Sequence, residues 1–276
     1  MRRSGGLLLG ATAGMLAVVL AACSGSSGSS STTESKSTST SLTAPSGGTG
    51  DDGSAQQQLV PAPVEGATTL QAPAKTVTPP AGIDGLLAWS TAGYPGTGTP
   101  QPGALANTHV PGPVSYQVTP PVGGPHNGIW MNAGVYTVPV PSERAVHLME
   151  HGAVWVTYRP DLSADQVAAL TAFVANQSMV PENASGTPQA NRYLVMSPWA
   201  SNQLPAPVVI SSWGYQLRVD DPADPRLQAF VDTFRNSRKY SPELGSPVDG
   251  VPVLTGGNPA SNGSALPNPQ GAVPAG

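Results

Sequence analysis

The four histidines are the residues of this chain best suited to chemistry, and they are close together in the sequence. They are His109, His126, His147 and His151, and the last two belong to the segment His147-Leu148-Met149-Glu150-His151-Gly152. On a helix, positions 147, 150 and 151 share one face; on a strand, 147 and 151 still point to one side while 150 points away. Two imidazoles four residues apart can bind one metal ion, and neutral imidazoles suit zinc or copper. We therefore predict a metal site on His147 and His151, with His126, His109 and Glu150 as further candidate ligands.

The spelling His-x-x-Glu-His also allows a catalytic interpretation. It matches the inverzincin proteases, in which two histidines bind zinc and the glutamate is the general base. Glu150 is then the candidate catalytic residue of a metal-dependent hydrolase. Such an enzyme needs a downstream acidic ligand, for which the candidates are Glu182, Asp220, Asp221 and Glu243. Because the helix would stop at Gly152, directly before a strand, we assign no reaction.

Three methionines bear on the identity of the metal. They are Met131, Met149 and Met196. Thioether ligands would favour Cu(I) if they approached the site, although apolar packing is the simpler role for each of them.

The elements that must position these residues are readable in the second half of the chain. A short helix capped by Ser142 and ended by Gly152 would carry His147 and His151. Strands are predicted at 153–158, 192–197, 207–212 and 216–219. A second helix has Ser163 as N-cap and Gln166 three residues later, with apolar residues at 167, 170 and 174.

A last helix completes the pattern. It has Asp224 as cap, Pro225 at its first position, and one apolar face formed by Leu227, Phe230, Val231 and Phe234. This order of elements predicts a single α+β domain, with two helices on one face of a mixed or antiparallel sheet.

The segments on either side of this domain have a different composition. Residues 23–80 are rich in Ser, Thr, Gly and Pro and carry too little apolar surface to order themselves, so we expect a tether. Residues 251–276 are similar, and we expect a disordered tail. The folded domain is then expected at 81–250.

The N-terminus has the pattern of a bacterial lipoprotein signal. Arg2 and Arg3 precede an apolar run over 7–19, and Leu20-Ala21-Ala22 precede Cys23, the single cysteine of the chain. We expect residues 1–22 to be removed and Cys23 to be diacylated, which would anchor the protein at the extracytoplasmic face of the plasma membrane. The alternative is an ordinary secretory signal with a cysteine that is there by chance.

Composition limits the other partners. Only 10% of residues are charged and the formal net charge is −4, with no basic block that would neutralise phosphates, so nucleic acid is not an expected partner. With Cys23 lipidated, no cysteine remains for an intramolecular disulfide.

A resemblance covers most of the expected domain. The residues that carry it are His109-Val110, Tyr116, Pro120 to His126, Trp130, Gly134-Val135-Tyr136, Ala145 to Val154, Tyr158, Pro160, Ser212-Trp213-Gly214, Phe230, Phe234 and Pro242-Glu243. In this pattern the chain resembles the bacterial family known as domain of unknown function 3105. The resemblance implies secreted or membrane-anchored proteins and no established activity. Relatives often have cysteines at the position of Ala133 and near that of Val248, so this chain lacks both partners of a pair that would staple the domain.

Two alternatives remain open beside metal binding. The histidines can serve the structure alone, by bonding to buried carbonyls. The domain can also be a tethered cell-envelope protein that contacts an unknown protein partner through aromatic side chains. The candidates for such contacts are Trp89, Trp130, Trp199 and Trp213.

Overall fold

A computed structural model of the chain describes residues 64–80, 82–183, 189–251, 254–255 and 258–259. The contacts divide the chain into two units, Met1–Ser41 and Leu42–Gly276, and every described residue belongs to the second. The expected lipoprotein signal and Cys23 therefore lie outside the described residues. None of the described helices has the length and apolar character needed to cross a membrane.

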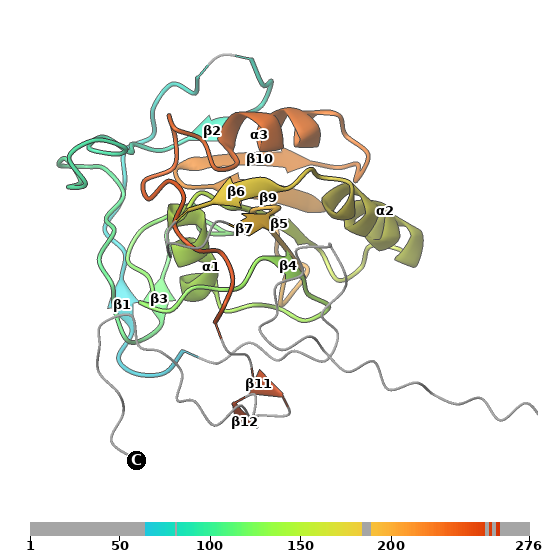
Figure 1. Ribbon diagram of the computed structural model, residues 1–276, viewed down its shortest axis with the longest axis horizontal. Helices are drawn as coiled ribbons and strands as arrows, with labels where there is room; N and C mark the ends of the chain where they lie inside the picture. Colours follow the sequence, from blue (N-terminus) through green and yellow to red (C-terminus); the bar gives the residue numbers. More distant parts are fainter. Residues whose placement is uncertain (1–63, 81, 184–188, 252–253, 256–257, 260–276) are drawn as a thin grey trace, which may run out of the picture. The chain divides into compact units, whose positions relative to one another are not determined.

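The main sheet of the described chain has the strand order β2-β10-β9-β5-β8-β4 (Figure 1). Its strands are β2 (Leu87–Ala88), β4 (Gly134–Val135), β5 (Val154–Tyr158), β8 (Leu194–Pro198), β9 (Val208–Ser212) and β10 (Tyr215–Val219). The strands β4, β8 and β5 pair in parallel, whereas β5 with β9, β9 with β10 and β10 with β2 pair antiparallel. The sheet is therefore mixed, which is one of the two arrangements that the sequence predicts.

Three short pairs of strands lie outside this sheet. β1 (Thr69–Leu70) pairs in parallel with β3 (Val114–Ser115), and β6 (Val180–Glu182) pairs antiparallel with β7 (Gln189–Asn191). β11 (Leu254–Thr255) pairs antiparallel with β12 (Asn258–Pro259).

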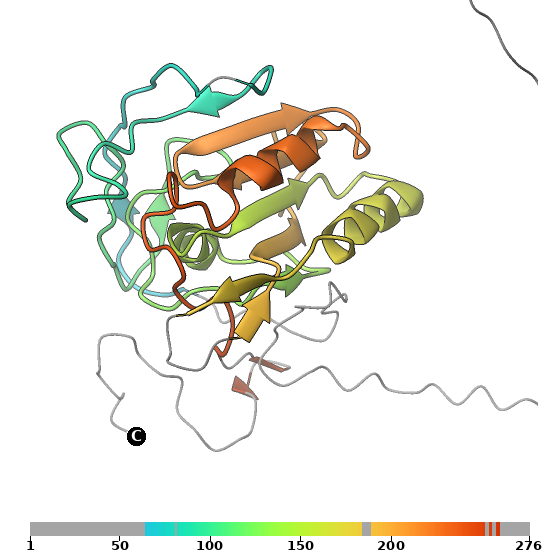
Figure 2. The ribbon, with the colours of Figure 1, turned by 45° about the horizontal axis from the view of Figure 1, so that its top comes forward.

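The helices cover both faces of the main sheet. They are α1 (Ser142–Glu150), α2 (Ala164–Ala175) and α3 (Arg226–Phe234). Val154 and Val156 of β5 pack in one core with the apolar faces of α2 and α3. Trp155, between them, packs in the other core with the apolar residues of α1, which are Ala145, Val146, Leu148 and Met149. Helices α2 and α3 therefore share one face of the sheet, and α1 lies on the opposite face (Figure 2).

The predicted caps are correct in one case and shifted in two. Ser163 and Gln166 form the complete capping box of α2. At α3 the cap residue is Pro225, and Asp224 one position earlier accepts the hydrogen bond from the backbone N–H of Arg226 at 2.9 Å. At α1 the prediction that Ser142 is the cap is wrong, because Pro141 holds that place without a side-chain bond and Ser142 is the first helical residue.

The strand predicted from Arg192 also begins later than expected. Tyr193 has a φ of 53°, which takes the chain out of extended geometry, so β8 starts at Leu194. Such a residue carries no marker in the sequence pattern, since positive φ outside glycine is uncommon.

Candidate metal centre

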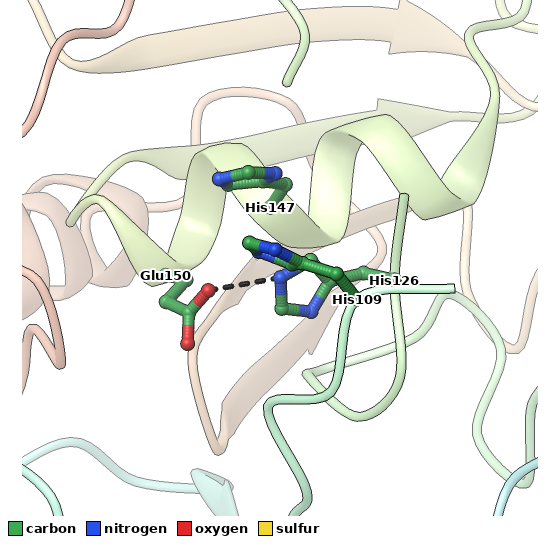
Figure 3. A group of neighbouring side chains, drawn as sticks. All are labelled: His109, His126, His147 and Glu150. Atoms are coloured by element: carbon green, nitrogen blue, oxygen red, sulfur yellow. Dashed lines mark ion pairs between the residues drawn. The ribbon is translucent and has the colours of Figure 1, made fainter. Parts of the chain in front are cut away.

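Three segments of the chain bring four potential metal ligands together. Helix α1 supplies His147 and Glu150, which lie one turn apart on one face. His126 follows the loop 118–125, and His109 pairs with it in an isolated parallel bridge. In that bridge Val110 N–H donates to the carbonyl of His126 at 2.7 Å, and His126 N–H donates to that of Thr108 at 3.0 Å. Figure 3 shows the four side chains converging from these segments.

The end of α1 is fixed by a Schellman motif. Ala153 N–H donates to the carbonyl of Leu148 at 3.1 Å, and Gly152 N–H donates to that of Met149 at 3.0 Å. Gly152 has a φ of 103°, as the expected terminator should. The helix thus ends directly after Glu150 and His151, and the backbone that carries these two side chains is held by hydrogen bonds.

The ligand atoms lie close enough to share one ion. His109, His126, His147 and Glu150 each offer one nitrogen or oxygen atom, and all four atoms lie within 4.8 Å of one another. The ring centroids of the three histidines are 4.8 to 4.9 Å apart. Nε2 of His126 lies 2.9 Å from Oε2 of Glu150. Four ligands at about 2.0–2.1 Å on one tetrahedral ion are about 3.4 Å apart, so the widest pair needs to close by about 1.4 Å.

Backbone carbonyls orient two of these imidazoles. Nδ1 of His126 lies 2.8 Å from the carbonyl oxygen of Gly124, and Nδ1 of His147 lies 2.7 Å from that of Asn127. A carbonyl only accepts, so Nδ1 must carry the proton that it donates. In the neutral ring Nε2 then has the free lone pair, which is the arrangement usual for metal-bound histidine.

Three buried polar atoms of the site lack hydrogen bonds among the described residues. Glu150 is 1% exposed, and neither of its carboxylate oxygens has a hydrogen-bond partner among the described residues. Nε2 of His126 also has none, so its 2.9 Å contact with Glu150 is not aligned as a hydrogen bond. Burial of a carboxylate without compensation is costly, and a cation between these atoms would compensate all of them.

The protonation of the imidazoles also suits metal binding. Burial is the main cause that lowers the pKa of His147, and the neighbouring His151 and His126 lower it further. The pKa of His109 is lowered by burial and by His126. Both rings are therefore neutral at physiological pH, which is the form that binds metal.

His151 lies beside this group and faces another way. Its ring is T-shaped to that of His147 at a centroid distance of 4.5 Å. Its Nδ1 bonds to the carbonyl of Pro247 at 2.5 Å, and its Nε2 is 3.5 Å from Oε2 of Glu243. The structure thus brings His147 together with His109 and His126, while the i, i+4 neighbour is directed toward Glu243.

The candidate downstream acids differ in their position. Glu243 reaches the rim of the site, and its backbone N–H donates to the carbonyl of Glu150 at 2.9 Å. Burial and the nearby Glu150 raise the pKa of Glu243. Glu182 instead accepts from Val248 N–H at 3.0 Å. Asp220 and Asp221 are at the end of β10, and neither belongs to the described ligand group.

The methionines and tryptophans have packing roles. Met131 and Met149 belong to the core beneath α1, and Met196 belongs to the core on the opposite face of the sheet.

Trp213 is fully buried, and its ring stands edge-on to that of His126, with ring centroids 5.8 Å apart. Trp89, Trp130 and Trp199 are partly buried against the core. The Trp130 ring lies 5.1 Å from that of His151 and shields this side of the site.

Ala133 and Val248, the two positions that the resemblance connects with a cysteine pair, are neighbours in space. Ala133 N–H donates to the carbonyl of Val248 at 2.6 Å, and both residues are buried in the core beneath α1. This bond places the segment around Val248 next to the part of the chain that contains the histidines.

The residues that sequence reasoning missed act mainly through their backbones. The carbonyls of Gly124, Asn127 and Pro247 orient three histidines, and no side-chain pattern marks them. Gln71, which bonds to the loop before His126, is the other missed residue.

Comparison with known proteins gives one match. The family model described as "Protein of unknown function (DUF3105)" matches residues 109–250, just over half of the chain, and this range contains all four histidines and Glu150. No curated protein and no solved structure matches the chain.

Proposed function

This chain belongs to the DUF3105 family, and because that family is described only as of unknown function, we propose its function from the geometry of the site. The protein is a membrane-anchored extracytoplasmic lipoprotein whose folded domain binds one divalent metal ion, zinc or copper, through His109, His126, His147 and Glu150. The observation that carries this proposal is the convergence of three imidazoles and one buried carboxylate within 4.8 Å.

The donor set selects the class of metal. Imidazole nitrogen suits zinc and copper, and the carboxylate adds one negative charge to a site whose other ligands are neutral. With the three methionines packed in the two cores, the set has no soft sulfur ligand among the described residues, which favours Zn(II) or Cu(II) over Cu(I).

The position of Glu150 favours a binding role over hydrolysis. A general base must reach a metal-bound water without being a ligand itself. Glu150 lies 2.9 Å from His126 and is part of the ligand group, so it is better suited to hold the ion than to activate water. We therefore propose a metal-binding domain and no reaction.

The membrane anchor rests on the lipobox ending at Cys23. Diacylation at Cys23 would place the metal site outside the cytoplasm on a long tether. Replacing Cys23 with Ser should release the protein from the membrane fraction and abolish fatty-acid labelling. A Cys23→Ser protein that stays in the membrane fraction and still incorporates fatty acid would contradict the proposed anchor.

Metal titration of the full-length chain in detergent tests the proposed site. After chelator treatment, the wild-type chain should bind one equivalent of Zn(II) or Cu(II), and the bound metal should raise the thermal midpoint by mass action. His147→Ala should lose this binding. His151→Ala is the matched control, since it removes the adjacent imidazole from outside the ligand group. Loss of binding in His151→Ala with retention in His147→Ala would contradict the assigned ligands.

A further inference from the structure

The segment formed by residues 64–75, here named the strap, precedes the family match and lies against the loop that carries His126. We propose that the strap is a working part of the metal site, with Gln71 as a positioning residue that holds the turn Gly123-Gly124 and, through it, the imidazole of His126. This inference rests on the proposed metal-binding function and identifies a residue on which the site depends.

The burial pattern of the strap first points to Gln71. Its side chain is 6% exposed and is the single buried one among the described residues 64–80. The residue before it, Leu70, is 77% exposed although it is apolar. In this segment Ala74 packs against the core beneath α1, while the most deeply buried side chain is an amide. The hydrogen bonds of that amide are therefore a main part of the attachment, because an unpaired buried amide is costly.

Both ends of this amide are paired. Nε2 of Gln71 donates to the carbonyl of Gly123 at 2.7 Å, and Oε1 accepts from the backbone N–H of Gln117 at 3.0 Å. The side chain thus joins the two ends of the loop 117–123. Such a joint limits how far the loop can move relative to the strap.

The joint is one residue away from the group that orients a ligand. The carbonyl of Gly124, next to the carbonyl that Gln71 holds, accepts the Nδ1 proton of His126 at 2.8 Å. The packing is tight here, since a Cβ on Gly124 would lie 2.1 Å from Nε2 of Gln71. If the turn rotated, it would lose the Gln71 bond and misdirect the His126 ring together.

Other bonds of the strap hold the same frame. Thr69 N–H donates to the carbonyl of Pro113 at 2.8 Å, and Gln71 N–H donates to that of Ser115 at 3.1 Å. The next residue along, Tyr116, donates from its hydroxyl to the carbonyl of Pro125 at 2.9 Å. The strap, β3 and the loop before His126 therefore form one hydrogen-bonded unit, to which the matched region 109–250 contributes only a part.

The test replaces the hydrogen bonds of Gln71 while keeping its volume. Gln71→Met should weaken Zn(II) binding by the full-length chain in detergent by about tenfold or more, in the range found when groups that orient metal ligands are removed. It should also change the electron paramagnetic resonance spectrum of bound Cu(II), which a loss of folding stability alone would not alter. Leu70→Ala is the matched control and should change neither. Wild-type affinity and an unaltered spectrum in Gln71→Met would overturn the inference.

A second readout separates this inference from the proposed function. In the metal-free chain labelled with ¹⁵N-histidine, the Nδ1 proton of His126 should exchange with solvent faster in Gln71→Met than in the wild type, while that of His151 should be unchanged. Equal exchange of the His126 proton in both chains would overturn the positioning role, whether or not metal binds. Failure of the wild type to bind metal would contradict the proposed function alone.

Discussion

Nε2 of His126 lies 2.9 Å from Oε2 of Glu150, in a contact where the two side chains are 0% and 1% exposed. Neither atom has a hydrogen-bond partner among the described residues. The two groups are therefore close and enclosed, and a shared cation would satisfy both. This relationship makes separate predictions for the metal-free and the metal-bound protein.

Glu150→Gln should weaken metal binding without destabilising the metal-free protein. The variant loses the one charged ligand, so Zn(II) affinity should fall by at least about tenfold, as with the loss of other metal-site groups. In chelator the thermal midpoint should stay equal or rise, because a buried neutral amide costs less than a buried carboxylate that accepts no hydrogen bond. Glu243→Gln is the control, as Glu243 is half exposed at 48%. A lower metal-free midpoint combined with unchanged affinity would contradict the role of Glu150.

The metal-free domain should lose stability as the pH falls. Burial lowers the pKa of His151 to about 4, and the pKa values of His109 and His147 are lowered as well. Each ring therefore takes up a proton more readily in the unfolded chain, whose histidines titrate near 6.5. The stabilisation is complete above that pH and is lost as the pH falls toward the folded pKa.

Urea denaturation between pH 7 and pH 4 in chelator measures this effect. Each such histidine should contribute a slope of up to about 1.4 kcal/mol per pH unit. His151→Gln should reduce the slope. An equal slope in the variant and the wild type would show that His151 does not have the depressed pKa.

Gly152→Ala should destabilise the domain through the end of α1. Gly152 has a φ of 103°, and a Cβ there would lie 2.7 Å from Oγ of Ser241 and 3.1 Å from Cα of Asn236. The strained backbone alone costs about 1–3 kcal/mol, to which the contacts add. Gly250→Ala is the control, because its φ of 77° is also positive but a Cβ would meet nothing within 4 Å. Equal losses of unfolding free energy in the two variants would mean that the contacts at Gly152 do not matter.

The double variant Ala133→Cys/Val248→Cys should form a disulfide. The 2.6 Å backbone bond between these residues places their Cα atoms within the range that a disulfide spans. A bridge that closes so long a loop should stabilise the oxidised chain by about 2–4 kcal/mol. Denaturation with and without reductant measures the gain, and free thiols titrated after oxidation would show that the two positions do not meet.

The parts of the fold that were predictable have local signals. The capping box formed by Ser163 and Gln166 fixes the start of α2. The spacing of Leu227, Phe230 and Val231 fixes the buried face of α3. The strand order is not local. Nothing in β5 or β8 alone shows that they pair in parallel, because that pairing depends on how the intervening helix returns the chain.

The candidate site was predictable only in its residue types. The sequence placed Glu150 and the four histidines in one region, and the spacing of His147 and His151 favoured that pair as the centre. The structure pairs His109 with His126 in a bridge between two loops and brings both next to His147 of α1, which periodicity cannot predict. His151 is directed away by the carbonyl of Pro247, a residue nearly one hundred positions later in the chain.

X-ray absorption at the zinc edge of the Zn(II)-loaded, full-length protein would identify the ligands of the metal ion. We expect one ion per chain, with three imidazole nitrogens and one carboxylate oxygen at about 2.0–2.2 Å, and loss of the imidazole signal as bound zinc disappears in His126→Ala. A shell of oxygen atoms alone, a sulfur ligand at about 2.3 Å, or a chain that retains no zinc would contradict it.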